Sequence, residues 1–158
     1  MSAGHAIRVV FVCTGNICRS PTAEAVLRAQ VLEAGLQDDI AVSSAGLAGW
    51  HVGADADSRS LRALRARGYD LDHSARQFRT HWFDEHELFV ALDTGHLAEL
   101  RSLGPHAEVR LLREWDPLGN GSVPDPYNEG PEGFETVLDM IERSCAGLLA
   151  ELRTRLPA

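Results

Sequence analysis

The chain has 158 residues, 44% of them hydrophobic and 24% charged, without repeats or low-complexity tracts. This length and composition predict one globular domain, residues 1–158, with a buried core. The formal net charge of −8 argues against nucleic acid as a partner, because binding to a phosphate backbone relies on positive charge. Any attraction for a phosphate-like substrate must therefore be local.

The amino-terminal segment shows no sign of export or membrane insertion. The apolar run Ile7–Cys13 is interrupted by Arg8 and is too short for a signal sequence or a membrane span. Three cysteines, an odd number, suit a reducing compartment better than a disulfide framework. We therefore expect a cytoplasmic protein without membrane contacts; export without a signal peptide stays open. The oligomeric state does not follow from the sequence, and a monomer is the default.

The first predicted strand ends at a cysteine. Residues Ile7–Val12 form a nearly continuous apolar run, typical of a strand covered on both faces. The next helix is predicted to have Ser20 as its N-cap and Pro21 as its first residue, since proline lacks only an N–H group that is unpaired there. The loop between directs backbone N–H groups and the positive end of the helix dipole toward one point. This predicts an anion site that favours the thiolate form of Cys13.

The remaining elements alternate between strands and helices. The first helix is expected to end near Gly35, and Ser44–Gly46 is expected to turn the chain. The other predicted elements are strands at Ile40–Ser43, Leu88–Leu92 and Val109–Leu112, helices at Asp57–Arg67 and from Thr94 to Leu103, and a long packed helix containing Phe134–Leu152. The arginines of the Asp57–Arg67 helix are assigned to its solvated side. The twenty residues Glu114–Gly133 form a loop of a length that is usually functional.

This alternation predicts a Rossmann-like α/β fold, a single domain in which helices cover both faces of a four-stranded parallel sheet. Ligands bind to such sheets beyond the carboxyl ends of the strands. Cys13, Ser44, Asp93 and the long loop each follow a predicted strand end. We therefore expect them to converge on one site.

The residues after Cys13 suit the binding and transfer of a phosphoryl group. Cys13 is the candidate nucleophile. Arg19 offers a planar fork of donors that matches two oxygens of a phosphate. Gly15 allows close approach of the backbone, and Asn16 tolerates the left-handed conformation that so tight a loop demands. The backbone from Thr14 to Arg19 is the predicted cradle for the anion.

A phosphoryl transfer from a phenol also needs an acid for the leaving oxygen. Two Asp-Pro pairs in the long loop qualify, Asp116-Pro117 and Asp125-Pro126, and in both the proline drives the aspartate toward extended geometry. Composition does not choose between them.

The string CTGNICRSP at residues 13–21 directly follows a short strand near the start of the chain. It resembles the signature of the low-molecular-weight protein tyrosine phosphatase family. The resemblance implies a phosphocysteine intermediate on Cys13, with Arg19 binding the phosphate. It also implies a general acid in an Asp-Pro-Tyr string, which favours Asp125.

The same resemblance assigns supporting roles around the loop. It implies that the Ser20 hydroxyl stabilises the Cys13 thiolate, whereas the residue types alone leave Ser20 as a helix cap. It also implies that Ser44 and His73 hold the loop asparagine, Asn16.

Aromatic and apolar side chains are candidate walls of the substrate site. Trp50 and Tyr127 suit the faces of a phenyl ring, although Trp50 alternatively belongs to the core. Ile17 lies within the cradle, where bacterial relatives that remove phosphate from arginine carry threonine. Phosphotyrosine-containing proteins or peptides are therefore the expected partners. The predicted substrate-binding residues are Thr14, Gly15, Asn16, Ile17, Cys18, Ser20, Trp50 and Tyr127.

Two further positions have open interpretations. Cys18 either fills space in the loop or traps an oxidised Cys13 as a disulfide, and the resemblance favours the disulfide. Many relatives have a second tyrosine where this chain has Asn128, which leaves any role of that tyrosine in doubt. Cys145 falls on the apolar stripe of the last helix and is expected in the core.

Three rival functions share parts of this pattern. An arsenate reductase needs further cysteines to relay a disulfide, and none lies between His73 and Cys145. A phosphocysteine carrier must avoid the hydrolysis that the arginine and the distal acid promote. A phosphoarginine phosphatase is disfavoured by Ile17. The sequence has no HExxH motif and no zinc-ligand spacing, so no metal and no cofactor are expected.

Overall fold

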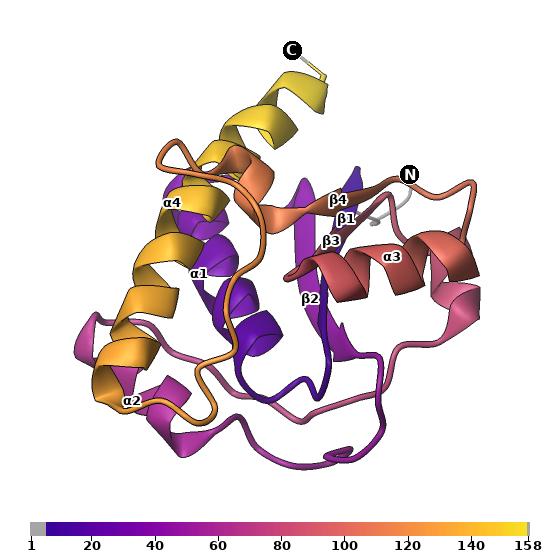
Figure 1. The fold of residues 1–158 in the computed structure, drawn as a ribbon. Helices are drawn as coiled ribbons and strands as arrows, with labels where there is room; N and C mark the ends of the chain where they lie inside the picture. The colour runs from indigo at the N-terminus through magenta and orange to yellow at the C-terminus, as the bar shows by residue number, and fades with distance from the viewer. Residues whose placement is uncertain (1–5, 158) are drawn as a thin grey trace.

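A computed structural model describes residues 6–157, and its four strands form one parallel sheet in the order β2-β1-β3-β4. The strands are β1 (Ile7–Cys13), β2 (Ile40–Gly46), β3 (Leu88–Ala91) and β4 (Val109–Leu111). The α-helices are α1 (Arg19–Glu33), α2 (Ser58–Ala66), α3 (Thr94–Leu103) and α4 (Pro131–Arg155), with short 3-10 helices η1 (Thr80–Asp84) and η2 (Leu112–Trp115). The predicted α/β class and the four-stranded parallel sheet are confirmed (Figure 1).

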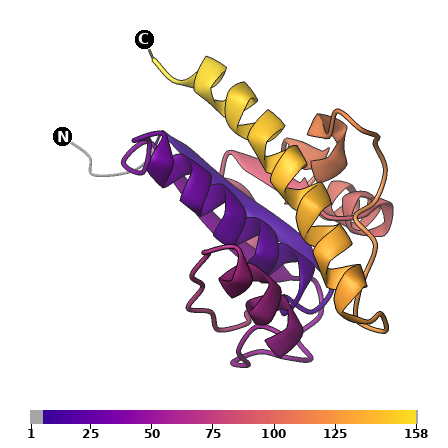
Figure 2. The same ribbon diagram turned by 90° about the vertical axis from the view of Figure 1, so that its left-hand side faces the viewer.

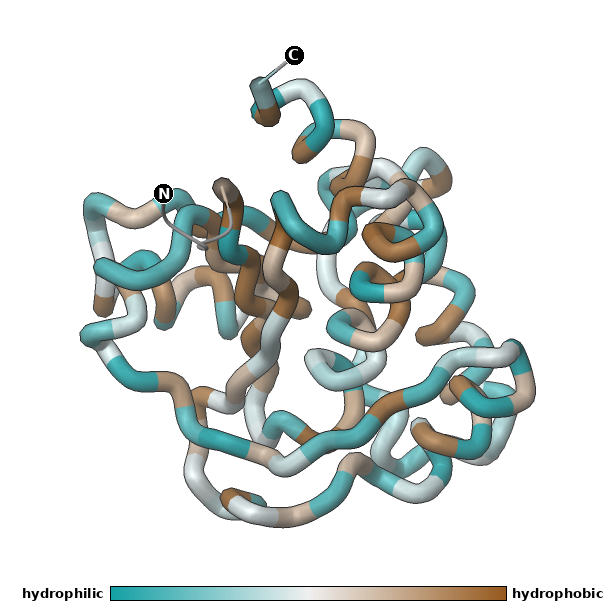
Figure 3. The backbone as a smooth tube through the Cα atoms, turned by 180° about the vertical axis from the view of Figure 1, so that it is seen from behind, coloured by the Kyte–Doolittle hydropathy of each residue, from teal (hydrophilic) through white to brown (hydrophobic). Residues whose placement is uncertain are grey.

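Alternation along β1 separates two hydrophobic cores. Val9 and Phe11 point into the larger core, which α1, α2 and α4 complete. Val10 and Val12 point to the other face, where α3 and the aromatic residues around η1 pack. Figure 2 shows α1 and α4 side by side on the first face, and Figure 3 shows hydrophobic residues along the strands between the two layers. Helices on both faces are therefore confirmed.

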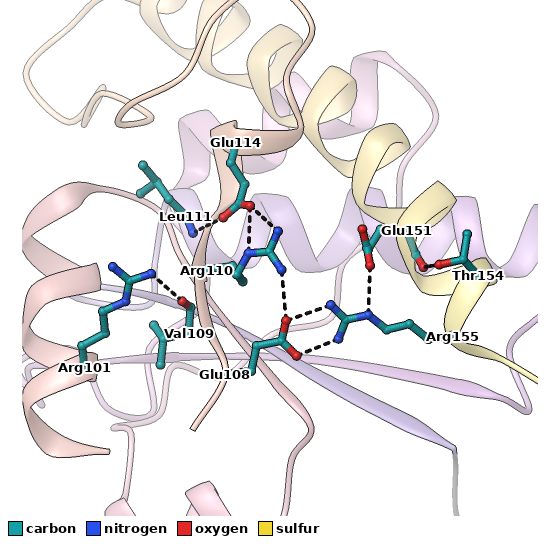
Figure 4. Close-up of polar contacts among 9 residues, drawn as sticks. All are labelled: Arg101, Glu108, Val109, Arg110, Leu111, Glu114, Glu151, Thr154 and Arg155. Atoms are coloured by element: carbon teal, nitrogen blue, oxygen red, sulfur yellow. Dashed lines mark hydrogen bonds and ion pairs between the residues drawn. The ribbon is translucent and has the colours of Figure 1, made fainter. Parts of the chain in front are cut away.

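The long helix α4 is held by its apolar stripe and by an ion pair near its carboxyl end. Its apolar stripe, which includes Ile141, Cys145 and Leu148, is buried against the sheet side of the larger core. Near its carboxyl end, Arg155 donates two hydrogen bonds to Glu108, at 2.7 and 2.8 Å, beside the start of β4 (Figure 4). Hydrogen bonds of this bidentate kind set orientation as well as distance. The helix thereby buttresses α1, whose amino end begins at the loop after β1.

Several sequence expectations about element boundaries are wrong. The predicted loop Glu114–Gly133 is shorter, because η2 extends to Trp115 and α4 begins at Pro131, and Leu112 belongs to η2 and not to β4. Residues Ser44–Gly46 continue β2 in place of turning the chain, because they pair with Phe11–Cys13 of β1. Helix α1 begins at Arg19 with Cys18 at the N-cap position, so Ser20 lies inside the first turn and does not cap it. Both differences extend regular secondary structure near Cys13, because β2 continues to Gly46 and α1 begins at Arg19. The predicted helix end at Gly35 agrees with its φ of 72°.

Candidate active site

A cavity of about 260 Å³ lies at the carboxyl end of β1. The β1–α1 loop, the loop after β2 and the segment before α4 meet at this end of the sheet (Figure 1). The lining residues are Cys13, Thr14, Gly15, Ile17, Cys18, Arg19, Trp50, His51, Asp125 and Tyr127. The predicted substrate-binding residues Asn16 and Ser20 do not line the cavity; both are fully buried behind it.

Cys13 lies at the end of β1 with its sulfur held by two donors. The Ser20 Oγ atom lies 2.8 Å from Cys13 Sγ, and the Asn16 backbone N–H donates to the same sulfur at 3.3 Å. Asn16 Nδ2 donates to Ser20 Oγ at 2.9 Å, so the serine hydroxyl hydrogen has two acceptors in reach, Cys13 Sγ at 2.8 Å and the Ala45 carbonyl at 3.5 Å. The Cys13 sulfur therefore lies just before the amino end of α1, with the Asn16 N–H directed at it and the Ser20 hydroxyl in contact with it.

Asn16 holds the loop in shape from behind. Its φ of 58° places it in the left-handed region, which asparagine tolerates better than most residues. Its Nδ2 also donates to Ser44 Oγ at 2.9 Å, and its Oδ1 accepts from the Arg76 N–H at 2.9 Å. His73 Nε2 donates to the Asn16 carbonyl at 2.7 Å. The structure thus brings Ser44 and His73 to Asn16.

A second network orients the arginine of the loop. Arg19 is buried, and its Nη1 donates to Asp93 Oδ2 at 2.9 Å and to the Val123 carbonyl at 3.0 Å. Burial alone raises the pKa of Asp93, but the hydrogen bonds from the His96 N–H and from Arg19 outweigh it and hold the pKa below its usual value. Asp93 is therefore an anion at neutral pH that fixes the guanidinium plane.

His96 extends this network to the wall of the cavity. Its Nε2 lies 2.8 Å from Thr14 Oγ1. Burial lowers the pKa of His96 to about 4, so the imidazole is neutral at physiological pH. Sequence reasoning gave no role to His96, although its position three residues after the strand-end Asp93 was a usable signal.

The two Asp-Pro pairs have different environments. Asp125 lines the cavity, with its Oδ2 3.8 Å from Arg19 Nη2 and its Oδ1 accepting from the Tyr127 N–H at 3.0 Å. The Asp116 side chain is fully buried away from the cavity and pairs with Arg113 and Arg143. Of the two carboxylates, only the first can meet a substrate in this cavity.

The rim of the cavity is aromatic. Trp50 is 77% exposed and Tyr127 is 48% exposed, and both line the cavity. The alternative that Trp50 belongs to the core is wrong. His51, which the sequence analysis did not single out, packs so closely that a Cβ atom on Gly15 would come within 2.9 Å of its ring.

Comparison with known proteins agrees with this geometry. A family profile described as low molecular weight phosphotyrosine protein phosphatase matches residues 8–158. The chain belongs to this family. A low molecular weight protein-tyrosine-phosphatase of Streptomyces coelicolor is 54% identical, over 92% of this chain and 93% of the relative. A crystal structure of a protein tyrosine phosphatase from Entamoeba histolytica with Hepes in its active site superposes with a TM-score of 0.90 at 32% identity, over 94% of this chain and 97% of that one.

In this phosphatase the other two cysteines are buried and unpaired. Burial is the main cause that raises the pKa of Cys18 to about 12, so Cys18 is a thiol at neutral pH. Cys145 is fully buried in the core, where desolvation raises the pKa of its thiol. Cys13 differs from both, because its sulfur accepts the Asn16 N–H and contacts the Ser20 hydroxyl beside the cavity.

Within residues 6–157 of the phosphatase, no group of three or more His, Cys, Asp or Glu side chains is arranged to hold a metal ion. None of the helices there combines the length and the apolar character that crossing a bilayer requires. The predicted lack of a signal segment concerns the first residues, and residues 1–5 lie outside the described part.

Proposed function

We propose that this phosphatase hydrolyses phosphotyrosine in proteins or peptides through a phosphocysteine intermediate. The observation that carries the proposal is the arrangement around one cavity. Cys13 Sγ lies there 2.8 Å from the Ser20 hydroxyl, Arg19 is buried and bonded to the Asp93 carboxylate, and Asp125 faces the same cavity from another segment.

The first step transfers the phosphoryl group to sulfur. The Cys13 thiolate attacks phosphorus, a P–S bond forms, and the P–O bond to the phenol breaks. Asp125 donates its proton to the leaving oxygen. The N–H groups of residues 14–19 and the Arg19 guanidinium bind the three remaining phosphate oxygens, whose charge they stabilise. The products of this step are a free phenol and the phosphorylated enzyme.

The second step regenerates the enzyme. The Asp125 carboxylate takes a proton from water as that water attacks phosphorus. The P–S bond breaks, inorganic phosphate leaves, and Cys13 returns to the thiolate that the Ser20 hydroxyl stabilises. The same carboxyl group therefore serves first as acid and then as base.

The walls of the cavity support an aromatic substrate. Trp50 and Tyr127 offer ring faces at the rim, and Ile17 offers an apolar side chain within the cradle. A phosphoarginine substrate, whose guanidinium is polar, gains less from these walls. Asn128 leaves the rim without the second tyrosine found in many relatives, so the wall there is the single ring of Tyr127.

We propose a cytoplasmic location and a monomeric state. A cytoplasmic location is supported by three cysteines that are free and buried. The net charge of −8 supports the absence of nucleic-acid partners, and a monomer without membrane partners is the default.

The activity is tested with an aryl phosphate in the presence of a chelator. Phosphate release is compared for the wild type, Cys13→Ser and Asp125→Asn. We expect activity in the wild type and none in Cys13→Ser. For Asp125→Asn we expect a loss of roughly 10²–10⁴ in turnover, which shrinks with better leaving groups because they need no acid. Equal activity of the wild type and Cys13→Ser would refute the proposal.

A further inference from the structure

Arg59, near the start of α2, contacts the segment that carries Asp125. Its Nη1 donates to the Tyr127 carbonyl at 2.7 Å. The same guanidinium lies over the Tyr127 ring, 5.1 Å from its centroid, and over the Phe134 ring at 4.7 Å. Cation–π contacts of this kind favour one position of the planar group. Arg59 is therefore held by a hydrogen bond and by stacking against residues 124–130, the acid segment that carries Asp125.

The other side of the guanidinium is held by Asp57. Arg59 Nε donates to Asp57 Oδ1 at 3.1 Å, and its Nη2 donates to Asp57 Oδ2 at 2.9 Å. Hydrogen bonding to Arg59 holds the pKa of Asp57 below its usual value, so the pair is ionised at neutral pH. A bidentate pair of this geometry restricts the rotation of the arginine.

Asp57 is in turn attached to the phosphate cradle. Its backbone N–H donates to the Ile17 carbonyl at 2.7 Å, and its side chain accepts the Arg59 N–H at 2.8 Å as the N-cap of α2. A continuous set of contacts therefore runs from the cradle at Ile17 through Asp57 and Arg59 to Tyr127. It joins the site that binds the phosphate to the segment that supplies the acid.

The acid segment has few other attachments. Val123 is anchored by its N–H to the Leu92 carbonyl at 2.7 Å and by its carbonyl to Arg19 Nη1 at 3.0 Å, and Pro126 is buried. Arg19 Nη2 also lies 3.8 Å from Asp125 Oδ2, without a hydrogen bond. Beyond them the chain is exposed from residue 127 to the start of α4. The Tyr127 N–H donates to Asp125 Oδ1, so fixing the Tyr127 residue also fixes the carboxylate two residues before it.

We propose that Arg59 is a positioning residue that sets the distance between the Asp125 carboxyl group and the phosphate cradle. The inference rests on the proposed function, because it assigns Arg59 an effect on proton delivery to the leaving oxygen. Loss of the guanidinium would let residues 124–130 move relative to the cradle while leaving the cradle itself intact. The defect should then appear only where the reaction needs the acid.

The test compares kcat/KM for phenyl phosphate, a poor leaving group, with that for 2,4-dinitrophenyl phosphate, a good one. For Arg59→Met we expect a loss of about tenfold with phenyl phosphate, which corresponds to one hydrogen bond to a charged group, and a loss of less than about twofold with the dinitrophenyl ester. In the Asp125→Asn background, Arg59→Met should cause no further leaving-group-dependent loss. Equal losses with both esters, or an undiminished loss in that background, would overturn the inference.

Arg62→Met is the matched control. Arg62 lies on the same helix, is exposed, and makes no hydrogen bond or ion pair with any described residue, so we expect both values of kcat/KM to match the wild type. A tenfold loss in this variant too would make the effect one of surface charge and overturn the inference. Inhibition by inorganic phosphate should be unchanged in Arg59→Met, because the cradle is intact.

Arg59→Lys provides the test if the methionine variant fails to fold. Lysine keeps the charge but cannot reach Asp57 in a bidentate manner and the Tyr127 carbonyl together, so the same leaving-group-dependent loss is expected. If lysine restores wild-type kcat/KM with phenyl phosphate, the positioning role is excluded. A wild-type leaving-group dependence in Asp125→Asn alone is a separate outcome, which removes the acid role of Asp125 and with it the inference.

Discussion

At the scale of single residues, Asn16 combines an unusual backbone with a full set of hydrogen bonds. Its amide group contacts Ser20, Ser44 and the Arg76 N–H, while its φ is 58°. Through Ser20 these contacts reach the sulfur of Cys13. The shape of the cradle and the direction of the Ser20 hydroxyl thus depend on one buried side chain.

Replacing Asn16 by alanine should therefore cost both stability and turnover. We expect a loss of about 2–4 kcal/mol in the free energy of unfolding, from hydrogen bonds to buried partners and from strain in the left-handed backbone. Urea denaturation at pH 7 measures it. Asn16→Gly also removes the hydrogen bonds, but glycine adopts the left-handed backbone without strain. We therefore expect Asn16→Gly to be about 1 kcal/mol more stable than Asn16→Ala. Unfolding free energies equal to that of the wild type in both variants would contradict this account.

Cys18 gives a residue-scale prediction about oxidation. Peroxide converts the Cys13 thiolate to a sulfenic acid. Cys18 then gives up its proton as its sulfur attacks Cys13 Sγ; the S–O bond breaks, a disulfide forms, and the hydroxyl group leaves with that proton as water. We expect a Cys13–Cys18 disulfide by mass spectrometry, with activity restored by dithiothreitol, and irreversible inactivation in Cys18→Ser. Detection of only sulfinic or sulfonic Cys13 in the wild type would exclude the trap.

The sequence was informative about residue types here but less so about their contacts. The loop, its anion site and the tolerance of Asn16 for its backbone follow from the residues. The role of Ser20 does not, because an N-cap and a hydroxyl donor look alike until the helix boundary is known. The start of α1 one residue before Ser20 frees the hydroxyl for Cys13.

At the scale of elements, a buried carboxylate joins η2 to α4. Asp116 accepts hydrogen bonds from Arg143 of α4 at 3.0 and 3.2 Å and from Arg113 at 3.2 Å. Burial alone raises its pKa, but the bonds from Arg143 and the Leu118 N–H outweigh it and hold the pKa below the usual value. No sequence pattern indicated this junction, because Arg143 is 27 residues away on another element.

Asp116→Asn should lower the free energy of unfolding by about 2–3 kcal/mol at neutral pH. This is at the low end of the cost of removing one partner of a buried ion pair, because Arg143 is partly exposed. Because the pKa of Asp116 is lower in the folded than in the unfolded state, the ionised carboxylate stabilises the fold at pH values above the unfolded-state pKa of about 3.9. This stabilisation is lost as the pH falls through the folded-state pKa. The difference between the wild type and the variant should therefore be full at pH 7 and shrink below about pH 4.

Urea titrations at several pH values measure this difference. The control is Asp139→Asn, which alters an exposed ion pair with Arg67 and should cost less than about 1 kcal/mol. Activity of Asp116→Asn at low temperature, where it stays folded, should be close to that of the wild type because Asp116 does not line the cavity. A loss of stability that is independent of pH would contradict the assignment.

At the scale of the whole molecule, the parallel order β2-β1-β3-β4 brings distant segments to one edge of the sheet. Cys13 ends β1, Asp93 follows β3, and the segment with Asp125 comes after β4. Their convergence was predictable because the carboxyl ends of parallel strands lie at one edge of the sheet. His51 and Arg59 were not, since their positions depend on how the loop after β2 and helix α2 pack against the cradle. The arginine pattern of residues 57–67 indicated only a solvated helix face for Arg59.

The central claim is that phosphate passes through Cys13. The most direct measurement mixes the enzyme with an aryl phosphate, quenches within milliseconds, and locates phosphate in the digested protein by mass spectrometry. We predict phosphate on the peptide that contains Cys13 in the wild type, and neither phosphorylation nor turnover in Cys13→Ser. Phosphate on another residue, or steady turnover by Cys13→Ser without a phosphorylated protein, would contradict the account.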